Sequence, residues 1–281
     1  MVAAVVVLFN PDVDVAKNIS SYMACVEKVY VIDNSDSSNE SILQSFALDN
    51  TIEYVFNNGN LGIAKALNIG CQRAIDDGME WVLTMDQDSK FLNLKPEMVS
   101  YVEQAVNSSV VLYYPNYLIE GIVYDKYIKE NNEPIVVMTS GNFINLKAYQ
   151  TMAGFEDKLF IDYVDIDYCL KIKAAGYKIA LLPDAILAHQ LGDSKHINFL
   201  SLQAIVTNHS SLRRYYITRN RLYVRKKYKT LSAVFTKTEE RIFINDLLKI
   251  ILFENYKISK FKSIVQGYLD YRNNKFGKYD Q

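Results

Sequence analysis

The sequence contains few of the residues that build disulfide scaffolds or zinc frameworks: three cysteines and three histidines occur among 281 residues. Cys25, Cys71 and Cys169 fall in segments with helical spacing, at intervals that match neither kind of framework. Isolated cysteines of this type are usually small core residues of proteins in a reducing compartment. We therefore expect a cytoplasmic protein whose cysteines are unpaired.

Long hydrophobic runs are also lacking. Residues 1–9 are apolar, but they have no basic leader and run into Asn10-Pro11, which is unlike a secretory signal. No apolar stretch approaches the roughly 20 residues that a membrane-spanning helix requires. With 49% hydrophobic and 22% charged residues, the composition is that of a folded globular protein, large enough for one domain with an appendage.

The net charge of −1 hides an uneven distribution along the chain. Residues 1–210 carry 14 Lys and Arg against 26 Asp and Glu, net −12, whereas residues 211–281 carry 17 against 6, net +11. We expect an acidic catalytic domain over 1–210 and a basic helical extension over 211–281. A basic extension favours an anionic partner, either a membrane surface or a phosphorylated ligand. Nucleic acid is disfavoured because no groove-reading or base-stacking module is recognisable.

The first 86 residues alternate between strand and helix patterns. The expected elements are, in order, a strand at 2–8, a helix at 13–26 capped by Asp12, a strand at 29–32, a helix near 40–48, a strand at 52–56, a helix from 63 through 74 and a strand ending at 86. This alternation predicts an α/β fold with a mainly parallel sheet covered by helices. Right-handed crossovers then place the loops after the strands at one edge.

The second half of the acidic region has a weaker pattern. We expect short strands and loops over 110–137, a small-residue turn feeding a strand at 140–145, and a helix at 168–175 ended by Gly176. A further strand is expected at 177–182, followed by an edge strand at 185–189.

Two carboxylates end the buried strand at 81–86. Asp86 and Asp88 are two residues apart, so on an extended backbone they point the same way, at the sheet edge where open α/β folds bind ligands. Converging carboxylates suit Mg²⁺ or Mn²⁺ held together with a substrate diphosphate. The alternative is a polar loop in which Asp88 caps a turn.

Polar residues follow the neighbouring strands at the same edge. Asn10 and Asp33-Asn34 provide donors and acceptors for a base or ribose. Asn60 and Gly62 open the next helix, whose N–H groups can face an anion, and Lys65 adds a positive charge. The alternative for each is ordinary turn chemistry. No Gly-x-Gly-x-x-Gly follows the first strand, so this is not a dinucleotide fingerprint.

A second acidic cluster, Asp162, Asp165 and Asp167, precedes the helix at 168–175. We assign helix capping to Asp162 and Asp167 and a general-base role to Asp165, because capping N–H groups lower the basicity of a carboxylate. His189 follows both acidic sites along the chain, so it is either a metal ligand or a hydrogen-bonded structural residue.

The basic extension contains an Arg-rich stretch from Arg213 to Lys227 and, later, an apolar stripe from Leu247 to Phe253 beside Lys249 and Lys257. Helices of this composition either lie on anionic membranes or pack as a solvated pair against the body of the protein.

Taken together, these segments resemble the family-2 inverting glycosyltransferases, most closely the bacterial rhamnosyltransferases of O-antigen and capsular polysaccharide synthesis. The resemblance covers roughly residues 1–225. It rests on the segments at 7–11 (VLFNP), 31–35 (VIDNS), 60–64 (NLGIA), 85–89 (MDQDS), 160–167 (FIDYVDID) and 189–193 (HQLGD).

The resemblance implies a GT-A type nucleotide-sugar-binding fold, a divalent cation (Mg²⁺ or Mn²⁺), a nucleotide-diphosphate-sugar donor such as dTDP-L-rhamnose, and a saccharide acceptor, lipid-linked in one alternative. It implies roles for individual residues: Asp33 at the base, Asp86 at the ribose or metal, Asp88 at the metal, Asp165 as the base, His189 at the metal or diphosphate, and Arg214, Tyr216, Arg219 and Asn220 at the leaving diphosphate. It also implies inversion by a single displacement.

One departure from the family pattern is Val164, where many relatives have Glu before the catalytic Asp. The base role then rests on Asp165, with Asp162 in reserve. Alternatives are a family member using a UDP-hexose or galactofuranose donor, a sugar nucleotidyltransferase, or a non-catalytic binding scaffold. A nucleotidyltransferase would need a basic phosphate loop after the first strand, where residues 9–12 offer none.

Overall fold

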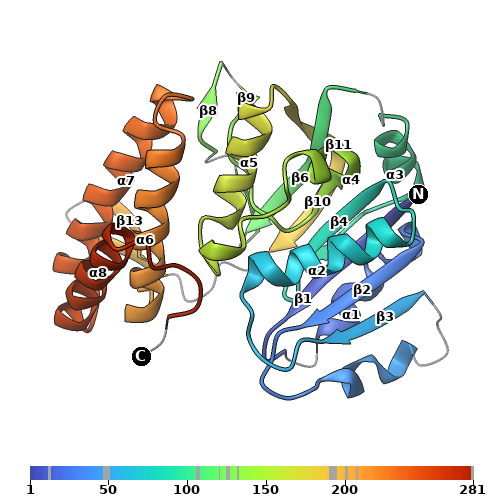
Figure 1. Cartoon of the computed structure of the whole chain (residues 1–281), viewed down its shortest axis with the longest axis horizontal. Helices are drawn as coiled ribbons and strands as arrows, with labels where there is room; N and C mark the ends of the chain where they lie inside the picture. Colours follow the sequence, from blue (N-terminus) through green and yellow to red (C-terminus); the bar gives the residue numbers. More distant parts are fainter. Residues whose placement is uncertain are drawn as a thin grey trace.

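The computed structural model describes residues 1–11, 14–46, 51–105, 108–119, 121–124, 127–131, 133–189, 195–199, 202–206 and 208–279. Its first half contains four parallel strands in the order β3-β2-β1-β4 (Figure 1). They span β1 (Val2–Leu8), β2 (Lys28–Asp33), β3 (Ile52–Phe56) and β4 (Trp81–Asp86), as the hydrophobic pattern predicts. All seven residues of β1 are buried, because helices cover both faces of this central strand.

The sheet continues past β4 through β10 (Asn142–Asn145), β6 (Val110–Ile119), β11 (Lys178–His189) and β5 (Lys90–Phe91). β10 runs antiparallel to both of its neighbours, and β6 and β11 are parallel. The short strand β7 (Ile122–Val123) pairs with β6. The sheet is therefore mixed, with its long strands mostly parallel, and the α/β prediction is confirmed.

Two predictions for this half were wrong in part. The region 110–137 contains the expected short strands, but it begins with the ten-residue strand β6, whose three tyrosines are all buried. The residues 178–189 form one continuous strand with a bulge between Leu181 and Ile186, and this strand lies inside the sheet because β5 pairs with its far side. Neither pairing partner is visible from the local sequence.

The helices of the catalytic region are α1 (Val15–Ser20), α2 (Ile63–Asp76), α3 (Pro96–Glu103), α4 (Leu146–Thr151) and α5 (Val164–Ala174). The expected helix at 13–26 is reduced to α1 and a 3₁₀ turn, and the one near 40–48 is a 3₁₀ helix at Glu40–Phe46. The predicted cap Asp12 lies outside the described residues. α2 packs closely on β1, since a Cβ at Gly70 would collide with the side chain of Val5.

The C-terminal region consists of α6 (Ser211–Lys227), α7 (Ala233–Leu252) and α8 (Lys257–Arg272), which lie side by side beyond α5 (Figure 1). Ser210 and Ser232 cap α6 and α7 by accepting hydrogen bonds from the N–H groups of Arg213 and Phe235. α6 begins where the extension is expected to begin, although its independence as a domain stays a prediction.

Two small hairpins complete the described structure: β8 (Lys129–Glu130) with β9 (Glu133–Pro134), and β12 (Lys195–Phe199) with β13 (Leu202–Val206). Among the described helices, none combines the length and the apolar character needed to cross a bilayer.

Candidate active site

Three predicted residues meet where β4 and β11 end. Asp86 is the last residue of β4, Asp88 follows in a turn, and His189 is the last residue of β11. One side-chain ligand atom from each lies within 4.8 Å of the other two. Two carboxylates and an imidazole at this spacing form a donor set for a divalent cation of the Mg²⁺ or Mn²⁺ type.

Ser89 fixes the orientation of the His189 ring. Its hydroxyl lies 2.7 Å from Nδ1 of His189, and Oδ1 of Asp88 lies 3.8 Å from the same nitrogen. The imidazole is largely buried, whereas the side chain of Asp88 is 48% exposed. Contacts of this kind hold the ring of a histidine in one orientation, so the imidazole of His189 is fixed beside the two carboxylates.

The electrostatics of Asp86 also favour a cation. Burial raises its pKa to about 6, the negative charge of Asp88 adds to this shift, and His189 opposes it. The backbone N–H of Asp86 donates to the hydroxyl of Ser140 at 3.0 Å, which fixes the end of β4. Burial and a neighbouring negative charge disfavour the ionised form of a carboxyl group. A divalent cation that binds beside it stabilises that ionised form.

Asp165 lies in the first turn of α5. Its pKa is raised to about 6, mainly by burial and also by the negative charges of Asp162 and Asp86, while the N–H of Ile166, which donates to its carboxylate at 2.8 Å, opposes the shift. A pKa near neutrality suits a carboxylate that accepts a proton.

The prediction that Asp162 and Asp167 cap the following helix was wrong. α5 begins at Val164, four residues before its predicted start, and has no side-chain cap. Asp162 accepts from Arg213 at 3.1 Å, and the buried Asp167 binds Lys227 at 2.7 Å. Both carboxylates therefore connect the catalytic region to the basic extension, contacts that local spacing does not reveal.

Asp33 and Asn34 are buried at the end of β2 and bonded within the chain. The carboxylate of Asp33 accepts hydrogen bonds from Tyr54, Ser35 and Asn39. Burial alone would raise the pKa of Asp33, but these hydrogen bonds outweigh it and lower the pKa. The amide of Asn34 donates to the carbonyl of Gly62 at 3.0 Å. These buried side chains hold the loops around the site in place.

The remaining predicted loop residues differ in exposure. Asn10 is exposed with a φ of 45°, Asn60 accepts from the N–H of Gly62, and Lys65 pairs with Asp157 at 3.1 Å. The N–H of Ile63 donates to the carbonyl of Phe160, so the start of α2 is partly occupied by the chain itself. Asn10 and Lys65 are therefore the exposed residues among these predicted donor contacts.

Arg214, Tyr216 and Arg219 lie in the core of the extension. Arg214 pairs with Glu254 at 2.5 Å, and the hydroxyl of Tyr216 accepts from the N–H of Tyr279. Arg219 is 1% exposed and donates to backbone carbonyls, including that of Leu159 at 3.2 Å. All three side chains are therefore bonded within the chain, and their role at the leaving diphosphate stays a prediction.

Two residues near Asp165 were missed or assigned differently from the sequence. The amide of the fully buried Asn220 donates to the carbonyls of Leu159, Ile161 and Asp162 at 2.8, 2.8 and 3.0 Å. Arg213, half exposed, is the cation that pairs with Asp162. Asn220 appeared in the resemblance only as a diphosphate contact, and no sequence signal indicates its role in holding this loop.

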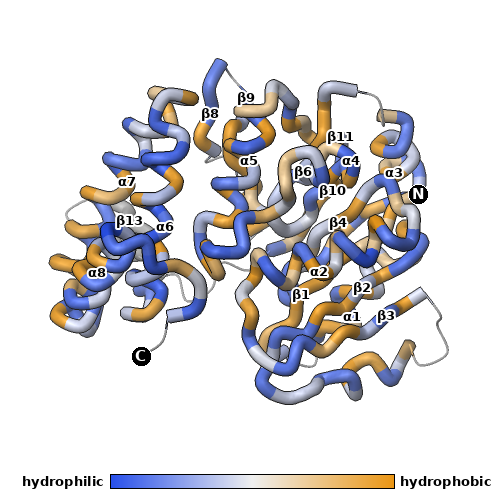
Figure 2. The backbone as a smooth tube through the Cα atoms, viewed as in Figure 1, coloured by the Kyte–Doolittle hydropathy of each residue, from blue (hydrophilic) through white to orange (hydrophobic). Residues whose placement is uncertain are grey.

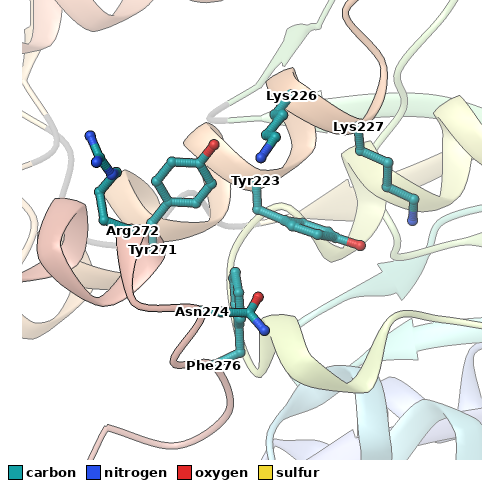
Figure 3. A pocket seen from close by; sticks show the side chains of 7 residues that line it. All are labelled: Tyr223, Lys226, Lys227, Tyr271, Arg272, Asn274 and Phe276. Carbon is teal, nitrogen blue, oxygen red and sulfur yellow. The ribbon is translucent and has the colours of Figure 1, made fainter.

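A separate cavity of about 600 Å³ lies between the ends of α6 and α8 and the C-terminal segment (Figure 3). Its lining residues are Tyr223, Lys226, Lys227, Tyr271, Arg272, Asn274 and Phe276. It includes none of the predicted site residues and no carboxylate, so it belongs to the basic surface of the extension.

Two solved structures show to which class this fold belongs. A fragment of S. aureus TarS in complex with UDP-GlcNAc matches with a TM-score of 0.59 at 14% identity, over 96% of this chain and 80% of that one. GalNAc-T7 with UDP, GalNAc and Mn²⁺ matches with a TM-score of 0.59 at 13% identity, over 80% of this chain. This chain spans 47% of GalNAc-T7 and 48% of a longer TarS structure. The fold is that of the GT-A glycosyltransferases.

The model of the glycosyl transferase family 2 matches residues 5–162, more than half of the sequence, and the chain belongs to this family. A curated relative, the dTDP-rhamnosyl transferase RfbF of Shigella flexneri, is 27% identical over 241 residues, which cover 80% of this chain and 79% of the relative. The protein is therefore a glycosyltransferase related to a rhamnosyltransferase.

Proposed function

We propose that the protein transfers L-rhamnose from dTDP-L-rhamnose to a saccharide hydroxyl, with the help of a divalent cation and with inversion of the anomeric configuration. The observation that carries this proposal is the cluster of Asp86, Asp88 and His189 where β4 and β11 end, whose ligand atoms lie within 4.8 Å of one another. The named relative supports the choice of donor.

The donor set of Asp86, Asp88 and His189 fits a divalent cation by ligand type and spacing. When bound there, the cation would neutralise the negative charge that grows on the departing nucleotide diphosphate. Asp86 and Asp88 supply the carboxylates, and Ser89 keeps the imidazole of His189 oriented towards the cluster. The choice between Mg²⁺ and Mn²⁺ is left open by this donor set.

The proton-accepting group in this proposal is the carboxylate of Asp165. It takes the proton of the acceptor hydroxyl while the hydroxyl oxygen attacks the face of the anomeric carbon opposite the diphosphate. The bond from the anomeric carbon to the diphosphate oxygen breaks in the same step, and configuration inverts. A diphosphate leaves as an anion and needs no general acid, so a single base is sufficient, unlike the two carboxylates of hydrolases.

The acceptor in this proposal is a saccharide of a growing polysaccharide, such as O-antigen or capsule, carried on a lipid. The reaction would take place in the cytoplasm, at the inner face of the membrane. Asn10 and the buried loop residues Asp33 and Asn34 would define the donor pocket, Asn10 by direct contact and the other two by shaping its wall.

A donor screen tests the proposal. The melting temperature of the protein is measured with Mn²⁺ or Mg²⁺ and each of dTDP-L-rhamnose, UDP-glucose, UDP-galactofuranose and UDP-GlcNAc, because a ligand stabilises the state it binds. We expect dTDP-L-rhamnose to give the largest increase and to release dTDP in the presence of acceptor glycan. A larger increase and turnover with a UDP-sugar would replace the proposed donor.

A further inference from the structure

The extension has an unusually apolar surface. More than half of the large hydrophobic side chains that are exposed among the described residues belong to residues 211–279, which are about a quarter of the chain. On α8, Ile258 is 76% and Val265 55% exposed, and on α7, Ile244 is 57% and Leu248 49% exposed. Exposed apolar residues at such spacing on two neighbouring helices mark an interaction surface.

The apolar surface is continuous between the two helices. A groove of about 390 Å³ is lined by Phe243 of α7, by Ile264, Val265 and Tyr268 of α8, and by Thr218, Arg221, Leu222 and Arg225 of α6. A second hollow of about 530 Å³ along α8 is lined by Ile258, Phe261, Lys262, Val265 and Gln266. Val265 is shared by both. Figure 2 shows hydrophobic residues along these helices at the end of the molecule farthest from the sheet.

The acidic residues of the extension are bonded to other residues of the extension. Glu239 binds Arg221 at 3.2 Å, Glu254 binds Lys260 at 2.8 Å, and Asp270 accepts from Tyr215. The two remaining acids in residues 211–279 are also paired: Asp246 with Arg221, and Glu240 with Arg225. Every carboxylate in this part of the described chain therefore has a cation or hydroxyl partner.

The cations left over lie on the surface. Lys257 and Lys262 are exposed on α8, and Lys237 and Arg241 are exposed on α7, without a carboxylate partner in the described structure. Lys257 precedes Ile258, and Lys262 lies between Ile258 and Val265 along α8, so the positive charges lie next to the apolar side chains. Lysines in this position extend towards phosphate headgroups while their stems lie on acyl chains.

We propose that the apolar surface of α7 and α8, centred on Ile258 and Val265, docks on a bilayer that contains anionic lipids. A lipid partner is indicated because exposed aliphatic side chains lie beside lysines that have no carboxylate partner. A protein partner would not require an excess of one charge around an apolar surface. The contact is peripheral: side chains enter the headgroup region and the helices lie in the plane of the membrane. The inference does not depend on the donor or acceptor of the reaction.

The test is cosedimentation of the full chain with vesicles of phosphatidylcholine alone or mixed with phosphatidylglycerol, at low and high salt. We expect binding only to the anionic vesicles, weakened by salt. Ile258→Ser/Val265→Ser should weaken binding at least about tenfold, and Lys257→Glu/Lys262→Glu about tenfold or more. The matched control Ile122→Ser/Val123→Ser changes two equally exposed side chains on β7 and should leave binding unchanged.

Two results would overturn the inference. One is equal binding of the wild type and Ile258→Ser/Val265→Ser to anionic vesicles. The other is no binding of the wild type to anionic vesicles. If analytical ultracentrifugation then shows a concentration-dependent dimer that the same double variant abolishes, the surface joins two copies of the chain. Neither measurement uses a sugar donor, so failure here is distinguishable from failure of the proposed transfer reaction.

Discussion

The side-chain amide of Asn220 in α6 donates to the backbone carbonyl of Asp162, three residues before Asp165, at 3.0 Å. The loop that it holds is strained, because Phe160, Asp162 and Tyr163 all have φ values between 61° and 67°. Each left-handed residue costs about 1 kcal/mol or more, and such conformations persist only where the surroundings impose them. The extension thus stabilises the backbone that presents the candidate base.

Replacing Asn220 by Asp should release this loop. A carboxylate cannot donate to the carbonyls of Leu159, Ile161 and Asp162 and would repel them, so we expect a loss of at least about 2 kcal/mol in the free energy of unfolding and a lower kcat. Denaturant unfolding and donor turnover measure the two effects. Asn245→Asp, an exposed substitution of the same chemistry on α7, is the control and should change neither. Retained stability in the Asn220 variant would refute the role of the amide.

The buried ion pair of Arg221 and Glu239 should contribute strongly to the attachment of the extension. Tyr163, which precedes α5, also hydrogen-bonds both side chains. Arg221→Ala leaves Glu239 buried without its cation, and we expect a loss of about 3–5 kcal/mol in the free energy of unfolding. In Arg225→Ala the lost partner, Glu240, is 55% exposed, and the loss should stay below about 1 kcal/mol. Equal losses of stability in the two variants would contradict the argument that the buried ion pair contributes more than the exposed one.

Binding of a divalent cation should depend on pH through Asp86. Folding raises its pKa from 3.8 to about 6. The protonated carboxyl group therefore contributes fully to the stability of the fold below pH 3.8, and this contribution is lost as the pH rises through 6. A cation restores stability only where the carboxyl group has lost its proton. We therefore expect Mn²⁺ to raise the melting temperature at about pH 7.5 but much less at about pH 5. The same increase at both values would exclude Asp86 as a ligand.

Removing Asp88 should weaken donor binding only when the cation is present. Asp88→Ala deletes one carboxylate of the cluster, and we expect the affinity for dTDP-L-rhamnose with Mn²⁺, measured by calorimetry, to fall about tenfold or more. With EDTA, the variant and the wild type should bind equally weakly. Asp76→Ala removes an exposed carboxylate at the end of α2, near the start of β4 and so at the opposite end of this strand from the cluster, and is the control. Unchanged affinity of Asp88→Ala with Mn²⁺ would count against the metal site.

The parts of the fold that follow from local pattern could be predicted from the sequence. The strand Val2–Leu8 is a continuous apolar run, and Asp86 and Asp88 end another such run, so both were placed correctly. The strand β6 and the interior position of β11 could not be predicted, because they depend on pairing between residues about 70 positions apart.

For the candidate site, residue type and position predicted that Asp86 and Asp88 lie together with His189, but only the structure shows which polar side chains are already hydrogen-bonded. Arg219 has the same chemistry as a diphosphate ligand, yet it is buried against carbonyls and aromatic rings of the extension. Asparagine is common in turns, but the three carbonyl partners of Asn220 lie about 60 positions away in the chain. Contacts over such separations have no periodic signal in the sequence.

The substitution Asp165→Asn tests the central claim most directly. Donor turnover with acceptor glycan is measured alongside calorimetric affinity for dTDP-L-rhamnose in the presence of Mn²⁺. Because the amide cannot accept the hydroxyl proton but has nearly the same shape, we predict a fall in kcat of about 100-fold or more with donor affinity nearly unchanged. Full turnover by Asp165→Asn would contradict the assignment of this carboxylate as the base.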